Sequence, residues 1–595
     1  MENRTRSATS GLTRDENRTS ERSDLVALIQ RTVADYPDNI AVSDQDIKIT
    51  YSEMSEYAGQ TASLLDDLGV EAGATVAICM GRQPVIIPVI AGILQAGCAY
   101  VPIDPNLPSG RREYMLRRSG AVAIFGDRDK IEEGIDRTVN VIDFRDIHTH
   151  PNRGQVPKVH PDNTACVLFT SGSSGKPKPV ALTHRNIIAF STNERLPDIR
   201  STDIIAHISS ISFDAFQYEI WSALKSGARL AVMATLSDLL NTDISRELRQ
   251  RNISVMLVPS MAFNHVISGD ANAFSSLRLL CIGGDVVSPG ACMTLLDGNF
   301  NGELYNLYGP TEATVACTTH RVETVDSNLD EVPIGLPLDG VTVRILDESL
   351  SDCPVGVIGQ IYIGGTTLSP GYFHDRALTD ERFLEDSQGV IYATGDRGRI
   401  DGNGVIHFHG RLDSQVKIRG YRVELREIEV AISQISSVKS CATLALGEGV
   451  DRHLIAFVVG GSRLSMTGVR LEVESLLPEY MVPTMFVRLA EIPVTSHGKR
   501  DDKKLLELAS EHHARRVNRV PPGDMLEEEI LRIWKEYLPI EGIGVTDDFY
   551  DLGGNSLIAF RVQRRINQEL RKNISQKDVL ISRTIRELAG IAQNA

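Results

Sequence analysis

The chain contains a polar, glycine-rich loop directly after an apolar run, and the two read Ala165-Cys166-Val167-Leu168-Phe169-Thr170-Ser171-Gly172-Ser173-Ser174-Gly175-Lys176-Pro177-Lys178. The apolar run before the glycines predicts a buried strand. Small and hydroxylated residues allow backbone N–H groups to wrap around a polyphosphate, and the lysines add positive charge. The spacing differs from the Gly-x-x-x-x-Gly-Lys-Ser/Thr phosphate loop. The alternative interpretation is a flexible surface loop.

The regions on either side of this loop divide the chain into parts of different character. Residues 23–410 alternate strand-like and helical stretches, which predicts a large α/β region with buried sheets. Residues 411–508 predict a smaller α+β unit, residues 509–522 a polar linker, and residues 523–595 an all-helical domain. Residues 1–22 contain almost no apolar side chains, which indicates a disordered tail.

The composition excludes several classes of protein. The net charge of −16 disfavours a nucleic-acid partner, and no apolar run is long enough to cross a bilayer. The eight cysteines include no Cys-x-x-Cys pair, which indicates core thiols in a reducing compartment. We therefore expect a cytoplasmic protein with no membrane contact.

Two further turns carry carboxylates. In Asn306-Leu307-Tyr308-Gly309-Pro310-Thr311-Glu312, a carboxylate beside a hydroxyl could hold a magnesium ion against phosphate oxygens. A type II turn with polar side chains is the alternative. In Tyr392-Ala393-Thr394-Gly395-Asp396, a buried aspartate could accept hydrogen bonds from two ribose hydroxyls, or it could be a simple turn aspartate.

The C-terminal third contains three more segments of interest. The charged stretch 410–424 would ordinarily be a solvated edge strand, and Lys499 in Ser496-His497-Gly498-Lys499 would ordinarily be a solubilising lysine. Ser556 follows two glycines in Asp551-Leu552-Gly553-Gly554-Asn555-Ser556-Leu557-Ile558. Apolar residues at Ile558, Val562 and Ile566 predict a helix that starts near this serine, and a helix N-terminus favours a phosphate. A simple N-cap serine is the alternative.

In this order and spacing, the segments resemble the adenylation domain of nonribosomal peptide synthetases, a branch of the adenylate-forming enzyme superfamily, fused to a peptidyl carrier (thiolation) domain. Further matches are the segments 49–54, 94–104 and 477–483. The resemblance covers residues 23–505 for adenylation and 523–595 for the carrier. It implies a large α/β adenylation core, a small mobile α+β subdomain and an all-α four-helix carrier domain.

The resemblance also implies an activity. Members of the family activate an amino-acid carboxylate with ATP and Mg²⁺, then transfer the acyl group to a thiol on 4′-phosphopantetheine. Ser556 would carry that group in this chain. Since no further synthetase domain precedes residue 23 or follows Ala595, we expect a stand-alone loading module. Partners would be a phosphopantetheinyl transferase, a downstream condensation or tailoring enzyme, and an MbtH-like helper protein.

Roles in the ATP site are carried over by position. The loop Thr170 to Lys176 would grip the β- and γ-phosphates, and Thr311 and Glu312 would face the α-phosphate and magnesium. Asp396 and Arg411 would bind the ribose, and Tyr308 would flank the adenine. Lys499 would bridge the substrate carboxylate and the nucleotide, and Asp413 would be the hinge.

The substrate pocket is mapped in the same way. Asp214 would pair with the substrate α-ammonium, and the rest of the lining would be Ala215, Tyr218, Met261, Cys281, Gly283, Leu307, Val315 and Ala316. Because this list holds no second charge, a charged substrate side chain would be left unpaired, which is costly in a buried pocket. We expect an uncharged side chain of medium to large size, either aromatic or branched aliphatic.

Two other functions compete with this interpretation. One is an acid–coenzyme A ligase, which Asp214 and the fused carrier argue against. The other is a catalytically silent carrier scaffold, which the presence of Lys499, Asp396, Glu312 and the phosphate loop argues against.

Overall fold

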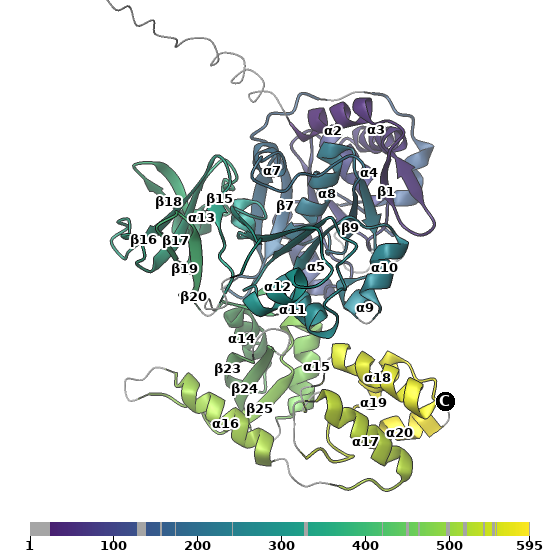
Figure 1. Cartoon of the computed structure of the whole chain (residues 1–595), viewed down its shortest axis with the longest axis vertical. Coiled ribbons are helices and arrows are strands. Elements are labelled where there is room, and N and C mark those ends of the chain that lie inside the picture. Colours follow the sequence, from purple (N-terminus) through teal and green to yellow (C-terminus); the bar gives the residue numbers. More distant parts are fainter. Residues whose placement is uncertain are drawn as a thin grey trace, which may run out of the picture.

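The computed structural model describes residues 24–127, 139–154, 157–172, 174–240, 242–325, 331–413, 415–418, 420–447, 452–461, 464–495, 500–515, 520–538, 542–549, 552, 554 and 556–593. The predicted N-terminal tail, Ser173 and Lys499 lie outside the described residues. Three units follow one another along the chain: a large subdomain (24–413), a small subdomain (415–515) and a C-terminal helical domain (520–593). Figure 1 shows the small subdomain and the helical domain side by side beneath the large subdomain.

The first sheet of the large subdomain holds the glycine-rich loop. Its strands run in the order β6-β5-β3-β4-β7-β8, with only β8 antiparallel. Every residue of β3 is buried, as expected for a parallel strand covered on both faces. The strands are β3 (Thr75–Cys79), β4 (Ala99–Pro102), β5 (Ala123–Gly126), β6 (Asn140–Asp143), β7 (Thr164–Thr170) and β8 (Lys178–Thr183).

The second sheet has nine strands in the order β15-β14-β13-β12-β11-β9-β10-β1-β2. Its centre is parallel, and β2, β14 and β15 pair antiparallel at the two edges. The strands are β1 (Ile40–Ser43), β2 (Lys48–Thr50), β9 (Ile204–His207), β10 (Arg229–Val232), β11 (Val255–Pro259), β12 (Leu279–Gly283), β13 (Glu303–Tyr308), β14 (Thr318–Arg321) and β15 (Leu336–Pro337).

Helix α8 (Asp214–Ser226) links the two sheets. Tyr100 of β4 donates a hydrogen bond to Gln217 of α8, and Tyr218 of the same helix contacts Cys281 of β12. The other helices around the sheets are α2 (Leu25–Asp35), α3 (Tyr51–Asp67), α4 (Ile86–Gln95), α5 (Ser109–Ser119), α7 (His184–Ser191), α9 (Leu236–Leu240), α10 (Ile244–Gln250), α11 (Ser260–Gly269) and α12 (Pro289–Leu296), with short 3₁₀ turns η1 (Phe144–Thr149) and η2 (Thr311–Ala313). One apolar core extends over both sheets, so the large subdomain packs as one body.

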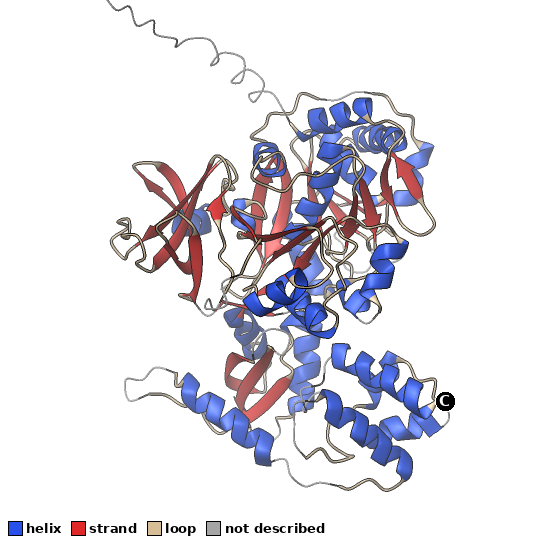
Figure 2. Ribbon diagram, in the orientation of Figure 1, coloured by secondary structure: helices blue, strands red, loops and turns tan. Residues whose placement is uncertain are grey.

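A third sheet completes the large subdomain and leads into the small one. It has the order β16-β17-β19-β18, with β20 paired to β19, and Figure 2 shows it as a separate layer to the left. Its elements are β16 (Val341–Leu346), β17 (Gly359–Gly365), α13 (Arg376–Arg382), β18 (Phe383–Asp386), β19 (Gly389–Ile400) and β20 (Ile406–Arg411).

The small subdomain starts with a charged hairpin and continues with a three-stranded sheet. Its elements are β21 (Gln415–Ile418), β22 (Tyr421–Glu424), α14 (Leu425–Ser433), β23 (Val438–Leu446), β24 (His453–Gly460), α15 (Met466–Leu476), η4 (Glu479–Met481), β25 (Met485–Leu489) and α16 (Asp502–Arg515). Helix α16 reaches into the stretch predicted as a linker from residue 509. Its Leu505 and Ala509 are buried in the cluster of β23, β24 and β25, which explains why the helix continues.

The C-terminal helical domain contains four described helices, α17 (Met525–Tyr537), α18 (Ser556–Leu570), α19 (Gln576–Ser582) and α20 (Ile585–Gln593). Trp534, Phe549, Val562 and Ile566 are buried in its core. The predicted four-helix domain is confirmed, and α18 begins at Ser556 as the apolar spacing predicts. No helix in the described part of the chain combines the length and the apolar character that a membrane span requires.

Candidate functional site

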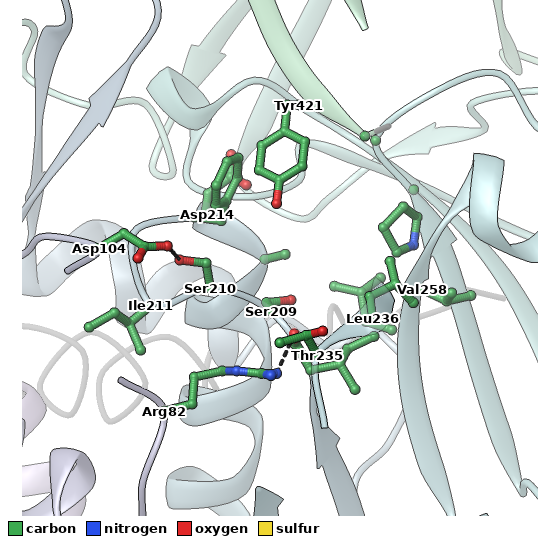
Figure 3. A pocket seen from close by; sticks show the side chains of 18 of the residues that line it. Arg82, Asp104, Ser209, Ser210, Ile211, Asp214, Thr235, Leu236, Val258 and Tyr421 are labelled. Atoms are coloured by element: carbon green, nitrogen blue, oxygen red, sulfur yellow. Dashed lines mark hydrogen bonds between the residues drawn. The ribbon is translucent and has the colours of Figure 1, made fainter. Parts of the chain in front are cut away.

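A cavity of about 550 Å³ lies where β11, β12 and β13 end next to the start of α8. Five residues of the predicted pocket line it: Asp214, Ala215, Gly283, Leu307 and Val315. Tyr421, from the hairpin of the small subdomain, closes another part of the wall (Figure 3). The cavity is therefore bounded by both subdomains.

Asp214 is the first residue of α8, and its carboxylate is the acidic group of the predicted pocket. Its Oδ2 accepts a hydrogen bond of 2.5 Å from the Thr311 hydroxyl. Burial raises the pKa of Asp214, while the hydrogen bonds from Thr311 and the Ala215 backbone act in the opposite direction. A half-buried carboxylate on the wall of an open cavity is suited to pair with a ligand cation.

The other four predicted pocket residues do not line this cavity, although all four are buried: Tyr218, Met261, Cys281 and Ala316. The Tyr218 hydroxyl lies 3.2 Å from the Cys281 sulfur, so the two side chains partner each other. Both belong to the apolar core of the large subdomain rather than to the cavity lining.

Sequence reasoning missed two charged side chains that the cavity includes. Arg82 donates a 2.6 Å hydrogen bond to the Ile208 carbonyl, and Asp104 accepts one of 3.2 Å from Ser210. Asp104 is the last residue of the segment 94–104 that resembles the family, so the sequence could have indicated it as a site residue. Arg82 follows β3 and belongs to no motif, so the sequence did not mark it.

The predicted nucleotide residues form one connected group. The Tyr308 hydroxyl donates a 2.6 Å hydrogen bond to Asp396, and Arg411 makes an ion pair with the same carboxylate. Arg411 also binds Asp413 with a contact of 2.7 Å, at the junction between β20 and β21. The structure thus brings together the predicted adenine, ribose and hinge positions.

Glu312 lies fully buried on η2 and accepts hydrogen bonds from Tyr372 at 2.9 Å and from Arg422 at 3.0 Å. Burial alone would raise its pKa, but the positive charges of Arg422 and Lys178 lower the pKa of Glu312 to about 2. No group of three or more acidic, histidine or cysteine side chains that could hold a metal occurs among the residues described here. One ionised carboxylate fits Mg²⁺, which takes most of its ligands from phosphate and water in nucleotide sites.

The glycine-rich loop connects the antiparallel strands β7 and β8. The buried Thr170 hydroxyl has no hydrogen-bond partner within the described structure, which fits a loop that receives an additional polar ligand. The Gly172 N–H is held by Glu427 at 3.1 Å, and the Ser171 hydroxyl is held by the Arg422 carbonyl at 2.7 Å. The small subdomain therefore packs directly on this loop.

The C-terminal helical domain also contacts the rest of the chain. Arg561 of α18 hydrogen-bonds to His265 of α11 in the large subdomain. A second cavity, of about 840 Å³, lies where the three units meet, and Pro108, Pro478 and Gly554 line it from each of them. Ser556 begins the helix that makes the Arg561 contact.

Comparisons with known proteins agree with this architecture. The AMP-binding enzyme family matches residues 29–373, and the phosphopantetheine attachment site family matches residues 528–591. Bacitracin synthase 2 from Bacillus licheniformis is 34% identical over an alignment of 579 residues that covers 96% of this chain. Because the match is only 22% of that synthase, the chain spans about a fifth of this relative's length.

Solved structures extend the likeness to the arrangement of the domains. The structure of holo-PA1221, an NRPS protein containing adenylation and PCP domains bound to a vinylsulfonamide inhibitor, has a TM-score of 0.82 at 25% identity. It covers 96% of this chain and 97% of that one. An o-succinylbenzoate CoA synthetase from Bacillus subtilis shares the fold at 18% identity and a TM-score of 0.71, over 81% of this chain and 98% of that one. The chain belongs to the AMP-binding enzyme family and is an adenylation–peptidyl carrier didomain of the nonribosomal peptide synthetase type.

Proposed function

We propose that the protein uses ATP to activate an α-amino acid and loads it as a thioester on its own carrier domain, the C-terminal helical domain. The observation that carries this proposal is the half-buried Asp214 carboxylate on the wall of the 550 Å³ cavity. An ammonium group that enters this cavity loses its water and needs a charged partner. A substrate without an amino group would leave Asp214 unpaired.

The residues of the ATP site have roles that follow from their contacts. Asp396, held by Tyr308 and Arg411, presents a fixed carboxylate to the ribose hydroxyls. Thr311 donates to Asp214 and precedes Glu312 on the turn η2, so we expect it to border both the amino-acid site and the α-phosphate position. Glu312 would hold Mg²⁺, which neutralises phosphate charge when bound.

Loading takes place on Ser556, where 4′-phosphopantetheine supplies the acceptor thiol when it is attached. The N–H groups at the start of the 15-residue helix α18 favour the attached phosphate. The contact between Arg561 and His265 supports loading of the protein's own carrier domain rather than a separate one.

The substrate side chain is expected to be uncharged and of medium to large size. Ala215, Gly283, Leu307 and Val315 give the cavity wall an apolar surface next to Asp214. Each methylene that the substrate buries there is worth about 0.8 kcal/mol, so glycine and alanine should be poor substrates. The two other charged side chains in the cavity, Arg82 and Asp104, already have hydrogen-bond partners in the Ile208 carbonyl and the Ser210 hydroxyl.

Amino-acid-dependent pyrophosphate exchange tests this proposal. The survey should include all proteinogenic amino acids, common non-proteinogenic ones, and the matching acids without the amino group. We expect the highest rates with uncharged aliphatic or aromatic amino acids. A preference for aspartate, lysine or an acid without an amino group would contradict the proposal.

A second candidate function is an acid–coenzyme A ligase. The o-succinylbenzoate CoA synthetase shares the fold of this chain, and that likeness concerns the fold alone. Free coenzyme A as the acceptor separates the two functions, because the proposed enzyme should load Ser556 and leave coenzyme A unacylated.

The carrier domain implies a phosphopantetheinyl transferase as a partner. We propose in addition a downstream condensation or tailoring enzyme that takes the loaded acyl group, and an MbtH-like helper protein.

Replacing Lys499 with alanine should slow adenylation by about a hundredfold or more, the scale for one well-placed charge donor in a transition state. Transfer from supplied aminoacyl-adenylate should lose much less, because Lys499 is expected to act only in the first half-reaction. Rapid-quench measurement of each half-reaction tests this.

Lys503→Ala provides the matched control, since Lys503 is an exposed lysine on α16 four residues along the chain. Equal losses in both half-reactions of Lys499→Ala would contradict the assignment.

A further inference from the structure

The segment that connects β9 to α8 is held by a buried carboxylate. Glu219 of α8 is fully buried, and its Oε1 accepts hydrogen bonds from the Ile208 N–H at 3.3 Å, the Ser209 N–H at 3.1 Å and the Ser209 hydroxyl at 2.8 Å. Its Oε2 lies 2.6 Å from Nδ1 of His207, which is also buried. One carboxylate therefore contacts three consecutive residues where the backbone leaves the sheet.

Arg82 holds the same segment through its carbonyl groups. The Nη1 atom of Arg82 donates to the Ile208 carbonyl at 2.6 Å and to the His207 carbonyl at 3.4 Å. Because Arg82 follows β3 of the first sheet and β9 belongs to the second, the guanidinium ties the two sheets together at this point. The N–H groups of the segment thus bind an anion and its carbonyl groups bind a cation, and such charge-assisted hydrogen bonds are roughly twice as strong as neutral ones.

The held segment lines the cavity and ends at Asp214, the first residue of α8. Residues 208–211 form part of the cavity wall beside Asp214 (Figure 3). The Ser212 hydroxyl donates to the Pro102 carbonyl at 3.2 Å, so the end of the segment is fixed as well. A shift of this segment would move both the cavity wall and the carboxylate that is proposed to bind the substrate ammonium.

The charges of Glu219 and Arg82 are better explained by geometry than by stability. Replacing buried charged groups with apolar residues of similar volume often leaves stability unchanged, whereas a fully satisfied polar network fixes one arrangement. A binding site needs its groups held within about 0.5 Å of the productive geometry. Asp214, which follows a six-residue connection between a strand and a helix, needs such support.

We propose that Glu219 and Arg82 are positioning residues that fix Asp214 by holding residues 207–209, one through the N–H groups and the other through the carbonyl groups. Their loss should weaken recognition of the substrate ammonium more than the chemistry of activation. This inference rests on the proposed function, since it takes Asp214 as the partner of an α-ammonium.

The quantity that tests the inference is a discrimination ratio, measured by pyrophosphate exchange with the full-length protein. It is kcat/KM for the preferred amino acid divided by kcat/KM for the matching acid without the amino group. Glu219→Gln and Arg82→Met should each lower this ratio about tenfold, mainly through a higher KM for the amino acid, the scale for one hydrogen bond to a charged group. Arg82→Lys keeps the charge and should restore part of the ratio.

The double variant Glu219→Gln/Arg82→Met tests whether the two residues act through one segment. Residues that share a partner show non-additive effects, so the double variant should lower the ratio no further than the larger single effect. Losses that multiply would mean that the two residues act separately, and would overturn the inference. Because Arg82 lies on the cavity wall rather than in the core, Arg82→Met and Arg82→Lys carry the test if the Glu219 variant does not fold.

Asp203→Asn is the matched control. Asp203 directly precedes β9, is buried, and makes an ion pair of 2.5 Å with Arg278 at the opposite end of the strand from the cavity. Its replacement should lower the melting temperature and leave the discrimination ratio unchanged. A fall in the ratio equal to that of the Glu219 and Arg82 variants would show general loosening of the fold, and would overturn the inference.

The outcomes separate the inference from the proposed function. Equal losses for the amino acid and for the matching acid in the Glu219 and Arg82 variants would overturn the inference and leave the proposed function intact. A discrimination ratio near one in the unaltered protein would overturn both.

Discussion

Ser556→Ala should abolish covalent loading while amino-acid-dependent pyrophosphate exchange continues at the rate of the unaltered protein. The two activities separate because exchange takes place in the large subdomain, whereas the acceptor thiol is attached at the first residue of α18. Intact-protein mass spectrometry after treatment with a phosphopantetheinyl transferase measures the attachment directly.

Attachment of the phosphopantetheine group to the Ser556→Ala protein would show that the modified serine lies elsewhere. Loss of exchange in the same variant would show that the carrier domain supports the adenylation domain in a way that the structure does not predict. The unaltered protein without transferase gives the mass baseline.

Asp214→Ala should lower kcat/KM for amino-acid activation by a factor that corresponds to about 3–5 kcal/mol, the cost of removing one partner from a buried charge pair. Asp214 is the predicted partner of the α-ammonium, and its hydrogen bond from Thr311 holds the carboxylate at the cavity wall. Pyrophosphate exchange with the preferred amino acid measures the loss.

The matching acid without an amino group serves as the internal control for Asp214. It has no charge that the alanine variant would leave unpaired, so its exchange rate should fall much less. Equal losses for the amino acid and for the matching acid would mean that Asp214 supports the pocket structurally rather than binding the ammonium.

Short sequence motifs correctly predicted those parts of the site whose structure depends only on residues close by in the sequence. The apolar run before Thr170 is a strand, Asp214 begins a helix, and Ser556 begins another. In each case a chemically distinctive residue follows or precedes a clear change in periodicity, so one short segment fixes both the element and the position of the side chain.

Contacts between distant segments could not be predicted in this way. Glu427 lies 255 residues from Gly172, beyond the charged stretch 410–424, and no motif in the sequence marks it. The hydrogen bond between Tyr218 and Cys281 likewise depends on the separation of α8 and β12, which no motif encodes. Arg82 enters the cavity because its side chain reaches from the segment after β3 to the carbonyls of His207 and Ile208 at the end of β9, in the other sheet.

The most direct test of the central claim is the intact mass of the holo protein after incubation with ATP, Mg²⁺ and its preferred amino acid. The account predicts that the mass of the protein rises by that of the amino acid less one water, and that hydroxylamine reverses the change, as expected for a thioester on the arm at Ser556. Pyrophosphate exchange without this mass increase, together with acylation of added coenzyme A, would contradict the account.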